Sequence, residues 1–497
     1  MSKVLRTLFS HQTCSRLRYS YARSKIPCIR SLSTSRPAYK PKPIAENDPA
    51  NAESFWQPRN DFMSVDKAAE YQRYEMVTAD DLRGRKQRPR RVKMLMRDFI
   101  EDSLYNPNYG YFSKQVTIFN PGDAFQFNAM ADEAEFYKLL SIRYKQFEDE
   151  LDTVSLNETR QLWHTPTELF RPYYGEAIAR SLVEQYKLTH HPYHDLIIYE
   201  MGAGNGTMML NILDHIRDFY PEIYPQTQFK IIEISTQLAE LQNAGLYKTA
   251  ASKGHLDHVQ IINKSIFDWD MYVPEPCWFL ALEVFDNFAH DIIRYDPGPK
   301  QAMQGSILVD SDGEFYEFYN AQIDPIASRF MQTRNEISHG SLPRNHPLNP
   351  SFTKRLLQNK LPFAPNLTSP EYIPTRLMQF FEVLKEYFPQ HRLLTSDFHI
   401  LPDTIDGYNA PVVQTRFQRK TIPVRTPLVH QGFFDILFPT DFVFMADLYK
   451  AITGKRGKVS THSEFLSHWA YTEDTKTKNG ENPMLSWYRN ASVMMTE

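Results

Sequence analysis

The sequence predicts an α/β protein whose central sheet is parallel and covered by helices on both faces. Segments such as "DLIIYE" (195–200) and "WFLALEVF" (278–285) are nearly continuous apolar runs, as in strands that are buried on both faces. Stretches with a helical spacing of apolar residues alternate with them. A turn with three glycines, Gly202, Gly204 and Gly206, follows the first of these strands, where open α/β sheets bind their ligands.

Composition excludes several classes of protein. The 497 residues exceed one ordinary core, so we expect two or three domains, or one domain with large insertions. Apolar runs stay well below the roughly 18 residues of a transmembrane helix, so none is expected. Three cysteines, Cys14, Cys28 and Cys277, predict neither a disulfide framework nor a zinc cluster, and no metal site is expected.

The first 45 residues differ from the rest. Residues 1–45 contain ten Lys or Arg residues and no Asp or Glu, and serine is frequent. This composition is typical of a mitochondrial transit peptide, with a disordered basic arm as the alternative. Without these residues the chain is acidic, which argues against a general nucleic-acid-binding protein. The polar residues 46–90 that follow are interpreted as a linker or arm.

The remaining elements divide the chain further. We expect an N-terminal helical region at 91–190, whose first helix covers 92–104. The sheet domain is expected at 191–470 with an insertion at about 300–373, and a C-terminal tail at 471–497. Further strands are predicted at 228–235, 259–269 and 392–401, helices at 208–220, 236–248 and 375–388, and a hairpin around Asp312-Gly313.

The glycine turn predicts a nucleotide-like ligand. Glycines let the backbone approach a ligand closely, and the helix that follows presents free N–H groups. The dinucleotide fingerprint G-x-G-x-x-G has a third glycine where this chain has Thr207. Glu200 and the shorter spacing Gly202-x-Gly204-x-Gly206 instead suit S-adenosylmethionine, which has no pyrophosphate. An NAD-dependent oxidoreductase is further disfavoured because no catalytic His or Tyr constellation is evident.

Acidic residues follow the next two strands. Glu233 ends the second strand, where a carboxylate can accept hydrogen bonds from both ribose hydroxyls. Asp268 ends the third segment, "IFDW", and could accept a hydrogen bond from the adenine amino group. A helix N-cap or an ordinary loop acid is an equally good interpretation of Asp268.

The fourth strand carries the candidate catalytic residues. Glu283 stands inside an otherwise apolar strand, and a lone buried carboxylate is costly without a partner. Asp286, three residues later, could face the same pocket. Carboxylates near strand ends are frequent at functional sites, and two of them can grip a planar guanidinium.

These motifs resemble, in order, those of the MidA-like (DUF185) class I methyltransferases. The resemblance covers most of residues 92–470. It is carried by the segments "FIEDSLYNPNYGYFS", "TPTELFRPYYGEAIA", "YEMGAGNGTMMLNIL", "IIEISTQLAELQNAGL", "LEVFDNFAHD", "RLLTSDF", "FFDILFPTDFVFMADLY" and "THSEFL". In this group the second segment reads T-S-P-E…F-G-E, for which Glu168, Gly175 and Glu176 are the counterparts. The chain departs from the group's pattern at Ala203, Asn211, Leu282 and Ala289.

The resemblance implies a Rossmann-like class I methyltransferase sheet with an N-terminal helical region and inserted segments. That group includes the mitochondrial protein arginine methyltransferase that assists assembly of respiratory complex I. By resemblance, we expect a mitochondrial, matrix enzyme that methylates arginine in a protein substrate with S-adenosyl-L-methionine. Glu200, Gly202, Gly204, Gly206, Glu233 and Asp268 are its expected cofactor-binding residues, and Glu283 and Asp286 its catalytic ones. A non-catalytic assembly factor that keeps the fold is the alternative, motivated by Leu282.

Overall fold

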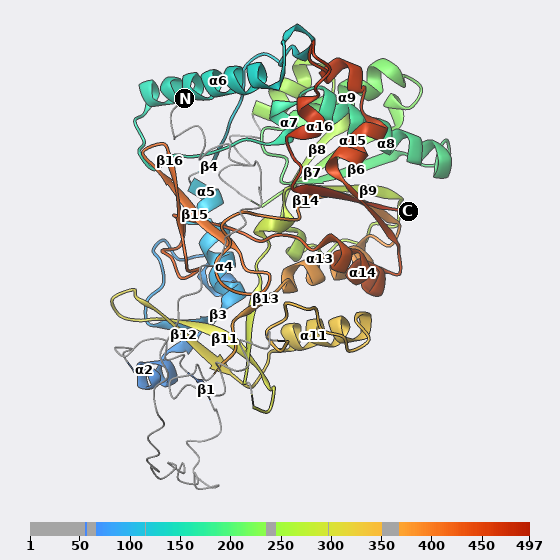
Figure 1. The fold of residues 1–497 in the computed structure, drawn as a ribbon. Coiled ribbons are helices and arrows are strands. Elements are labelled where there is room, and N and C mark those ends of the chain that lie inside the picture. Colours follow the sequence, from blue (N-terminus) through green and yellow to red (C-terminus); the bar gives the residue numbers. More distant parts are fainter. Residues whose placement is uncertain (1–54, 57–65, 115, 235–244, 297, 350–366) are drawn as a thin grey trace, which may run out of the picture. The chain divides into compact units, whose positions relative to one another are not determined.

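The computed structural model describes residues 55–56, 66–114, 116–234, 245–296, 298–349 and 367–497 (Figure 1). The expected transit peptide at 1–45 and most of the expected helix at 236–248 lie outside the described residues. None of the described helices combines the length and the apolar composition that crossing a membrane requires.

The main sheet has the strand order β18-β19-β14-β9-β6-β7-β8 in the described part of the chain. The five strands from β14 to β8 run parallel, whereas β19 runs antiparallel to both of its neighbours. Its strands are β6 (Leu196–Met201), β7 (Thr227–Glu233), β8 (Val259–Asn263), β9 (Cys277–Leu282), β14 (His391–Phe398), β18 (Gly457–Thr461) and β19 (Ala491–Thr496). The predicted parallel core is therefore present, with an antiparallel strand added near one edge.

Strand β19 corrects the expected C-terminal tail at 471–497. This strand pairs with β14 on one side and with β18 on the other, so it lies inside the sheet. Its residues are mostly buried, and Met494 belongs to the main apolar core. The sequence "ASVMMT" is short and lacks alternation, which hid the strand.

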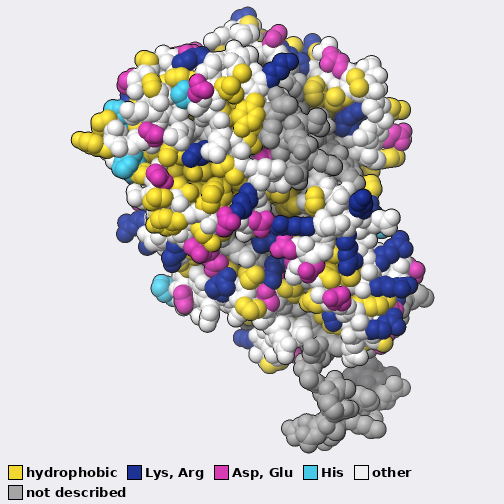
Figure 2. Space-filling view, turned by 180° about the vertical axis from the view of Figure 1, so that it is seen from behind, with side chains coloured by type: hydrophobic (Ala, Val, Ile, Leu, Met, Phe, Trp, Pro, Cys, Tyr) yellow, Lys and Arg dark blue, Asp and Glu magenta, His cyan; other side chains and the backbone are white. Residues whose placement is uncertain are grey.

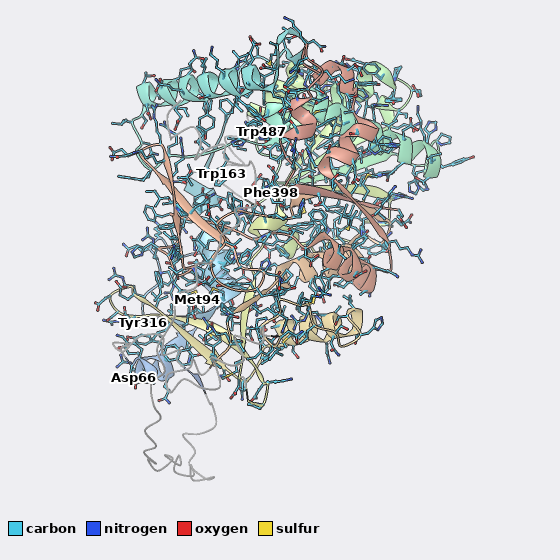
Figure 3. All side chains as sticks on the ribbon, viewed as in Figure 1. Asp66, Met94, Trp163, Tyr316, Phe398 and Trp487 are labelled. Carbon is cyan, nitrogen blue, oxygen red and sulfur yellow. The ribbon has the colours of Figure 1, made fainter. Side chains whose placement is uncertain are left out.

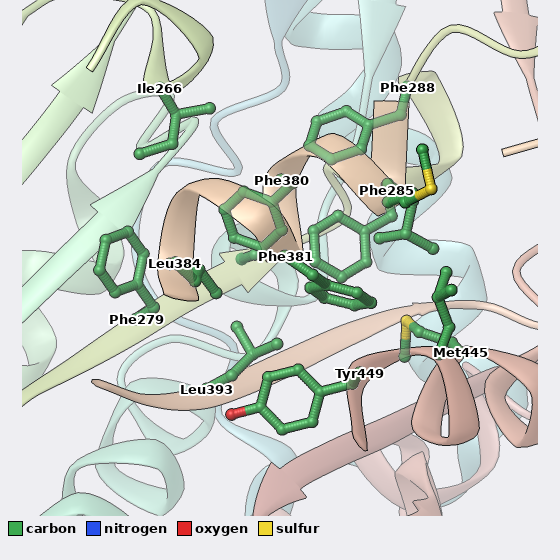
Figure 4. Close-up of a cluster of buried hydrophobic side chains, with 14 of the residues drawn as sticks. Ile266, Phe279, Phe285, Phe288, Phe380, Phe381, Leu384, Leu393, Met445 and Tyr449 are labelled. Carbon is green, nitrogen blue, oxygen red and sulfur yellow. The ribbon is translucent and has the colours of Figure 1, made fainter. Parts of the chain in front are cut away.

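Helices cover both faces of the sheet (Figure 1). One face carries α8 (Tyr173–Thr189), α9 (Thr207–Phe219), α15 (His462–Trp469) and α16 (Pro483–Ser486). The other carries α13 (Thr375–Tyr387) and α14 (Phe442–Thr453). Beneath the sheet, Phe279 of β9 and Leu393 of β14 pack against Phe381, Met445 and Tyr449 of these two helices (Figure 4). Burial of this apolar surface holds the carboxyl ends of the strands at a common edge.

The expected insertion at 300–373 forms part of a second sheet. The strands of this second sheet are β1 (Phe55–Trp56), β2 (Glu75–Met76), β3 (Val92–Leu95), β10 (Asp291–Tyr295), β11 (Ala302–Val309), β12 (Phe315–Asn320) and β13 (Glu371–Ile373). The hairpin predicted around Asp312-Gly313 is present, because β11 and β12 pair antiparallel across that turn. Helix α11 (Pro325–Ile337) follows, so much of the described part of this segment is regular structure.

The region before the main sheet differs from the prediction in two respects. The expected helix at 92–104 begins as strand β3, whose Val92 and Met94 are buried in alternation, and becomes α4 (Met96–Tyr105) only afterwards. A four-residue strand carries too few residues for its period to be recognised. The expected linker at 46–90 contains α2 (Ala68–Arg73) and α3 (Ala79–Leu82), which pack against the second sheet.

The expected helical region at 91–190 is a mixture of helices and short strands. It holds α5 (Tyr111–Lys114), β4 (Val116–Ile118), α6 (Glu133–Val154), β5 (Gln161–Trp163) and α7 (Pro166–Leu169) before α8. Strand β5 also approaches β15 (Val412–Phe417), which pairs with β16 (Lys420–Val424) and β17 (Asp435–Leu437). On the face in Figure 2, basic and acidic side chains of the described residues are interspersed.

Candidate active site

The glycine turn joins β6 to α9 at the carboxyl edge of the main sheet. Gly202, Gly204 and Gly206 have φ angles of 67°, 54° and 73°, in the left-handed region that favours glycine. A Cβ atom on Gly204 would lie 2.6 Å from Ile118 Cδ1, so a side chain there would also meet protein. The turn therefore has no side chains at these three positions, at the place where open α/β sheets bind their ligands.

Glu168 of α7 fixes this turn from outside. Its Oε1 accepts hydrogen bonds from Asn205 Nδ2 at 3.0 Å and from Thr207 Oγ1 at 2.7 Å. Its Oε2 accepts one from Arg171 at 3.1 Å, and the Glu168 side chain is buried. The segment "TPTELF", which contains Glu168, thus positions the loop between β6 and α9.

Glu200 is the polar side chain best placed to meet a ligand at this turn. It is only 4% exposed, and its Oε2 has no hydrogen-bond partner among the described residues. Burial, together with the charge of Glu233, raises the pKa of Glu200 to about 8. Buried polar atoms in native proteins nearly always have partners. This carboxyl oxygen and the bare glycine backbone therefore fit a polar cofactor.

The two other expected cofactor residues lie at neighbouring strand ends. Glu233 is the last residue of β7, is partly exposed, and accepts a hydrogen bond from Ile234 N at 3.1 Å. Asp268 ends a short 3₁₀ turn, and its carboxylate is 2.9 Å from Arg83 Nη1. Ser265 caps that turn, so the N-cap interpretation of Asp268 is wrong. The roles of Glu233 and Asp268 toward ribose and adenine stay predictions.

Glu283 is the first residue after β9, not a residue inside the strand as the sequence suggested. Its backbone N donates to Ser396 O at 2.8 Å, and its φ is 53°. A left-handed φ is unfavourable for a residue with a Cβ, and such strain gathers at functional sites. Burial and the neighbouring Asp397 raise the pKa of Glu283 well above its ordinary value.

Three more acids surround this position. We call Glu283, Asp286, Asp397 and Asp435 the site acids. Asp397 Oδ2 accepts hydrogen bonds from Phe285 N at 2.8 Å and Asp286 N at 3.2 Å. Asp435 Oδ1 accepts one from Asn287 Nδ2 at 3.0 Å, whereas Asp286 Oδ1 has no partner among the described residues. No described Lys, Arg or His forms an ion pair with any of the four.

Burial dominates the protonation of the site acids. It raises the pKa of Asp397 and that of Asp435 to about 7 each. Burial and then the charge of Asp397 raise the pKa of Asp286 well above its usual range. Sequence reasoning missed Asp397 and Asp435. Asp397 could have been found by the rule that selected Glu283, because it stands near the end of the buried strand β14.

Aromatic side chains lie beside Glu283. Tyr174 of α8 and Tyr488, just before β19, are both buried, and both pack against the ring of His462. Phe398, the last residue of β14, contacts Tyr488 with ring centroids 6.3 Å apart; Figure 3 labels Phe398 and Trp487, the residue before Tyr488. These residues come from four separate elements, and sequence analysis did not select them.

The geometry of the turn and the acids agrees with a family match. The sequence profile of the family described as "Putative S-adenosyl-L-methionine-dependent methyltransferase" matches residues 177–460, which is more than half of the chain. The chain belongs to this family. Its cofactor is S-adenosyl-L-methionine, and the protein is a methyltransferase, as the resemblance implied. Among the described residues no group of His, Cys, Asp or Glu is arranged to hold a metal ion.

Two curated relatives are similar over most of the chain. The first is "Protein arginine methyltransferase NDUFAF7 homolog, mitochondrial" from Schizosaccharomyces pombe, 26% identical over 392 residues, which cover 76% of this chain and 80% of the relative. The protein with the same name from Saccharomyces cerevisiae is 21% identical over 357 residues, covering 65% and 77%. Both names support the mitochondrial localisation predicted from the N-terminal composition.

A solved structure shares the fold. It is a COG1565 superfamily member and likely methyl transferase, as its title puts it, from Burkholderia thailandensis, bound to S-adenosyl-homocysteine. The TM-score is 0.50 at 13% identity, covering 82% of this chain and 88% of the other. The similarity confirms the predicted class I methyltransferase fold.

Proposed function

We propose that the protein methylates a guanidino nitrogen of an arginine side chain in a mitochondrial protein. The observation that carries the proposal is the group of site acids: three of them are buried, Glu283 is partly exposed, and none forms an ion pair with a described Lys, Arg or His. A cation bound beside these acids would compensate carboxylates that the fold leaves without a cationic partner. A guanidinium is planar, always charged and suited to paired hydrogen bonds with carboxylates.

Glu283 and Asp286, the two candidate catalytic acids predicted from the sequence, each have a role in this proposal. When bound, S-adenosyl-L-methionine supplies the methyl group on a sulfonium that leaves as a thioether. Glu283 and Asp286 orient the guanidinium so that one nitrogen faces the methyl group. That nitrogen loses a proton as its bond to the methyl carbon forms. A guanidinium bound beside Glu283 would favour its ionised form, and the raised pKa of this carboxylate then suits it to accept that proton.

The relatives support the finer parts of the proposal. Both curated relatives carry arginine methyltransferase in their names. The resemblance to the group with the complex I assembly enzyme makes a complex I subunit in the matrix the first candidate substrate.

The test compares wild type with Glu283→Gln. Each protein is incubated with S-adenosyl-L-methionine carrying a labelled methyl group and with mitochondrial extract from cells that lack the protein. Labelled methylarginine is measured after acid hydrolysis. We expect Glu283→Gln to lower its formation by about 100-fold or more, the scale seen when a transition-state hydrogen bond is removed. Cofactor affinity, measured by calorimetry, should stay within about threefold because Glu283 lies beyond the glycine turn.

Two further variants serve as controls. Glu382→Gln changes a partly exposed glutamate of α13, paired with Arg329 at 2.7 Å, and should keep full activity. Gly204→Val should abolish cofactor binding, because it adds a side chain where φ is left-handed and Ile118 is close. Label found only on residues other than arginine would refute arginine specificity. Undiminished turnover by Glu283→Gln would remove Glu283 from the mechanism.

A further inference from the structure

His462 is a buried histidine whose polar atoms have no partners. It is the first residue of α15, directly after the N-cap Thr461, and it is 1% exposed. Neither Nδ1 nor Nε2 has a hydrogen-bond partner among the described residues. Burial lowers the pKa of His462 to about 4, so the ring is neutral near pH 7. An unpaired buried polar group costs about 1–3 kcal/mol, and a native fold that keeps one calls for an explanation.

Two tyrosines connect this imidazole to Glu283. The ring of Tyr174 lies 5.4 Å from that of His462, and the ring of Tyr488 lies 5.7 Å from it. Both tyrosines lie within electrostatic reach of Glu283: after burial, its charge is the next cause that raises the pKa of each. The side chain of Ser396 acts to lower the pKa of Tyr174, and the carbonyl oxygen of Ser396 accepts a hydrogen bond from Glu283 N. His462 therefore belongs to the wall beside Glu283.

Topology places His462 farther from the cofactor turn than Glu283 along the edge of the sheet. In the strand order, β9 lies between β6, which leads to the glycine turn, and β14. Strand β18 runs parallel to β14 because each is antiparallel to β19, so its carboxyl end lies at the same edge. His462 follows that end of β18. Along this edge Glu283 follows the strand next to the cofactor turn, and His462 follows β18, three strands further on beyond β14 and β19; a substrate nitrogen must approach from the side opposite the cofactor.

We propose that His462 binds the acceptor side chain by accepting a hydrogen bond from one of its guanidino N–H groups. This inference rests on the proposed function. A guanidinium has five N–H groups, and carboxylates on one side leave others to be paired. A neutral imidazole offers one acceptor nitrogen without adding a positive charge beside the substrate. Together with Glu283 it would fix the plane of the guanidinium, leaving one nitrogen directed toward the methyl group.

The test uses a substitution that separates binding from packing. His462→Phe keeps an aromatic ring and removes both nitrogens. Replacing an unpaired buried polar group by an apolar one is neutral or stabilising, so its melting temperature should equal or exceed that of wild type. The initial rate of methylarginine formation, with the extract described above, should fall at least about tenfold, since one hydrogen bond to a charged group is lost. His462→Gln, which restores an acceptor, should recover much of that rate.

His215 provides the matched control. It is also buried with both ring nitrogens unpaired among the described residues, but it stacks on Phe219 at 4.6 Å and lies in α9. His215→Phe should match wild type in rate. Cofactor affinity should stay within about twofold for all three variants, as expected for contacts made only with the acceptor.

The outcomes separate this proposal from the proposed function. No methylarginine with wild type would overturn the proposed function and this assignment with it. Methylarginine made equally well by wild type and His462→Phe would overturn the assignment alone. So would a rate loss in which cofactor affinity falls in parallel. If His462→Phe fails to fold, His462→Leu, which is smaller and equally apolar, takes its place under the same criteria.

Discussion

Two groups of buried acids in this protein are built differently. Around Arg97, Asp291 accepts hydrogen bonds from Arg97 at 2.8 Å, Gln304 at 2.9 Å and Thr375 at 2.7 Å. Asp324 is paired with the same guanidinium. Every carboxylate in this group thus has a cation from the protein itself. The site acids at the edge of the main sheet have backbone and amide donors but no described cation.

The difference appears in the protonation of the two groups. Burial acts to raise the pKa of Asp324, but the hydrogen bonds and charge of Arg97 outweigh it and lower that pKa. At the site acids burial prevails, and the pKa values rise. The acids around Arg97 are compensated within the fold. We infer that the site acids stay uncompensated until a ligand arrives, because acids with shifted pKa values are frequent at functional sites.

The largest expected effect comes from removing the cation of the Arg97 group, so that its acids, like the site acids, have no cationic partner. Arg97→Met keeps an unbranched side chain, although a shorter one, and removes the cation, which leaves the buried Asp291 and the partly buried Asp324 without it. Breaking a buried pair in this way costs about 3–5 kcal/mol. We expect urea denaturation to show a loss of that size in the free energy of unfolding. A loss below about 1 kcal/mol would mean that the two groups are less different than their contacts indicate.

The second effect depends on pH and is expected at Glu200, a further buried acid without a described cation, beside the glycine turn. Its pKa is about 8 in the folded protein and 4.5 ordinarily. Between these values the folded state keeps a proton that the unfolded state releases, so wild type loses stability as pH rises through this window. Glu200→Gln has no such loss. Its unfolding free energy, relative to wild type without cofactor, should rise by up to about 1.4 kcal/mol per pH unit.

Denaturation between pH 5 and pH 9 measures this difference, which should level off above pH 8. The contributions of other ionisable groups cancel in this difference in unfolding free energy, because both proteins share those groups. A difference that stays flat across the window would show that Glu200 has found a partner in the folded protein. Cofactor affinity should fall in Glu200→Gln, because the orphaned Oε2 is the atom left for the ligand.

The sequence predicts those parts of the candidate site that depend on local rules. Glu200, the three glycines and Glu233 follow from the position of strand ends and from one turn. Glu283 was also found, because an acid beside an apolar run is unusual whether or not the strand includes it. These features need only the residues within one strand and the turn after it.

Other parts depended on contacts between distant segments. Tyr174, His462 and Tyr488 come from α8, α15 and the segment before β19, and nothing in their local sequence indicates that they meet. Strand β19 was likewise taken for a tail, because its place is fixed by pairing with β14 and β18. Such pairings are specified by tertiary packing, which outweighs the weak local preference of a six-residue segment.

The smallest expected effect concerns Asp268, which stands between the two kinds of acid. It has a cation, Arg83, but both side chains are largely exposed, at 41% and 49%, and such pairs contribute about 0.2–1 kcal/mol. Arg83→Ala should therefore change unfolding free energy by less than about 1 kcal/mol. If Asp268 accepts the adenine amino group, Arg83 competes for it, and Arg83→Ala should leave cofactor affinity unchanged or slightly tighter. Asp268→Ala should weaken that affinity up to about tenfold, the effect expected when one hydrogen bond is lost. Equal cofactor affinity in Asp268→Ala and wild type would show that Asp268 does not bind the cofactor.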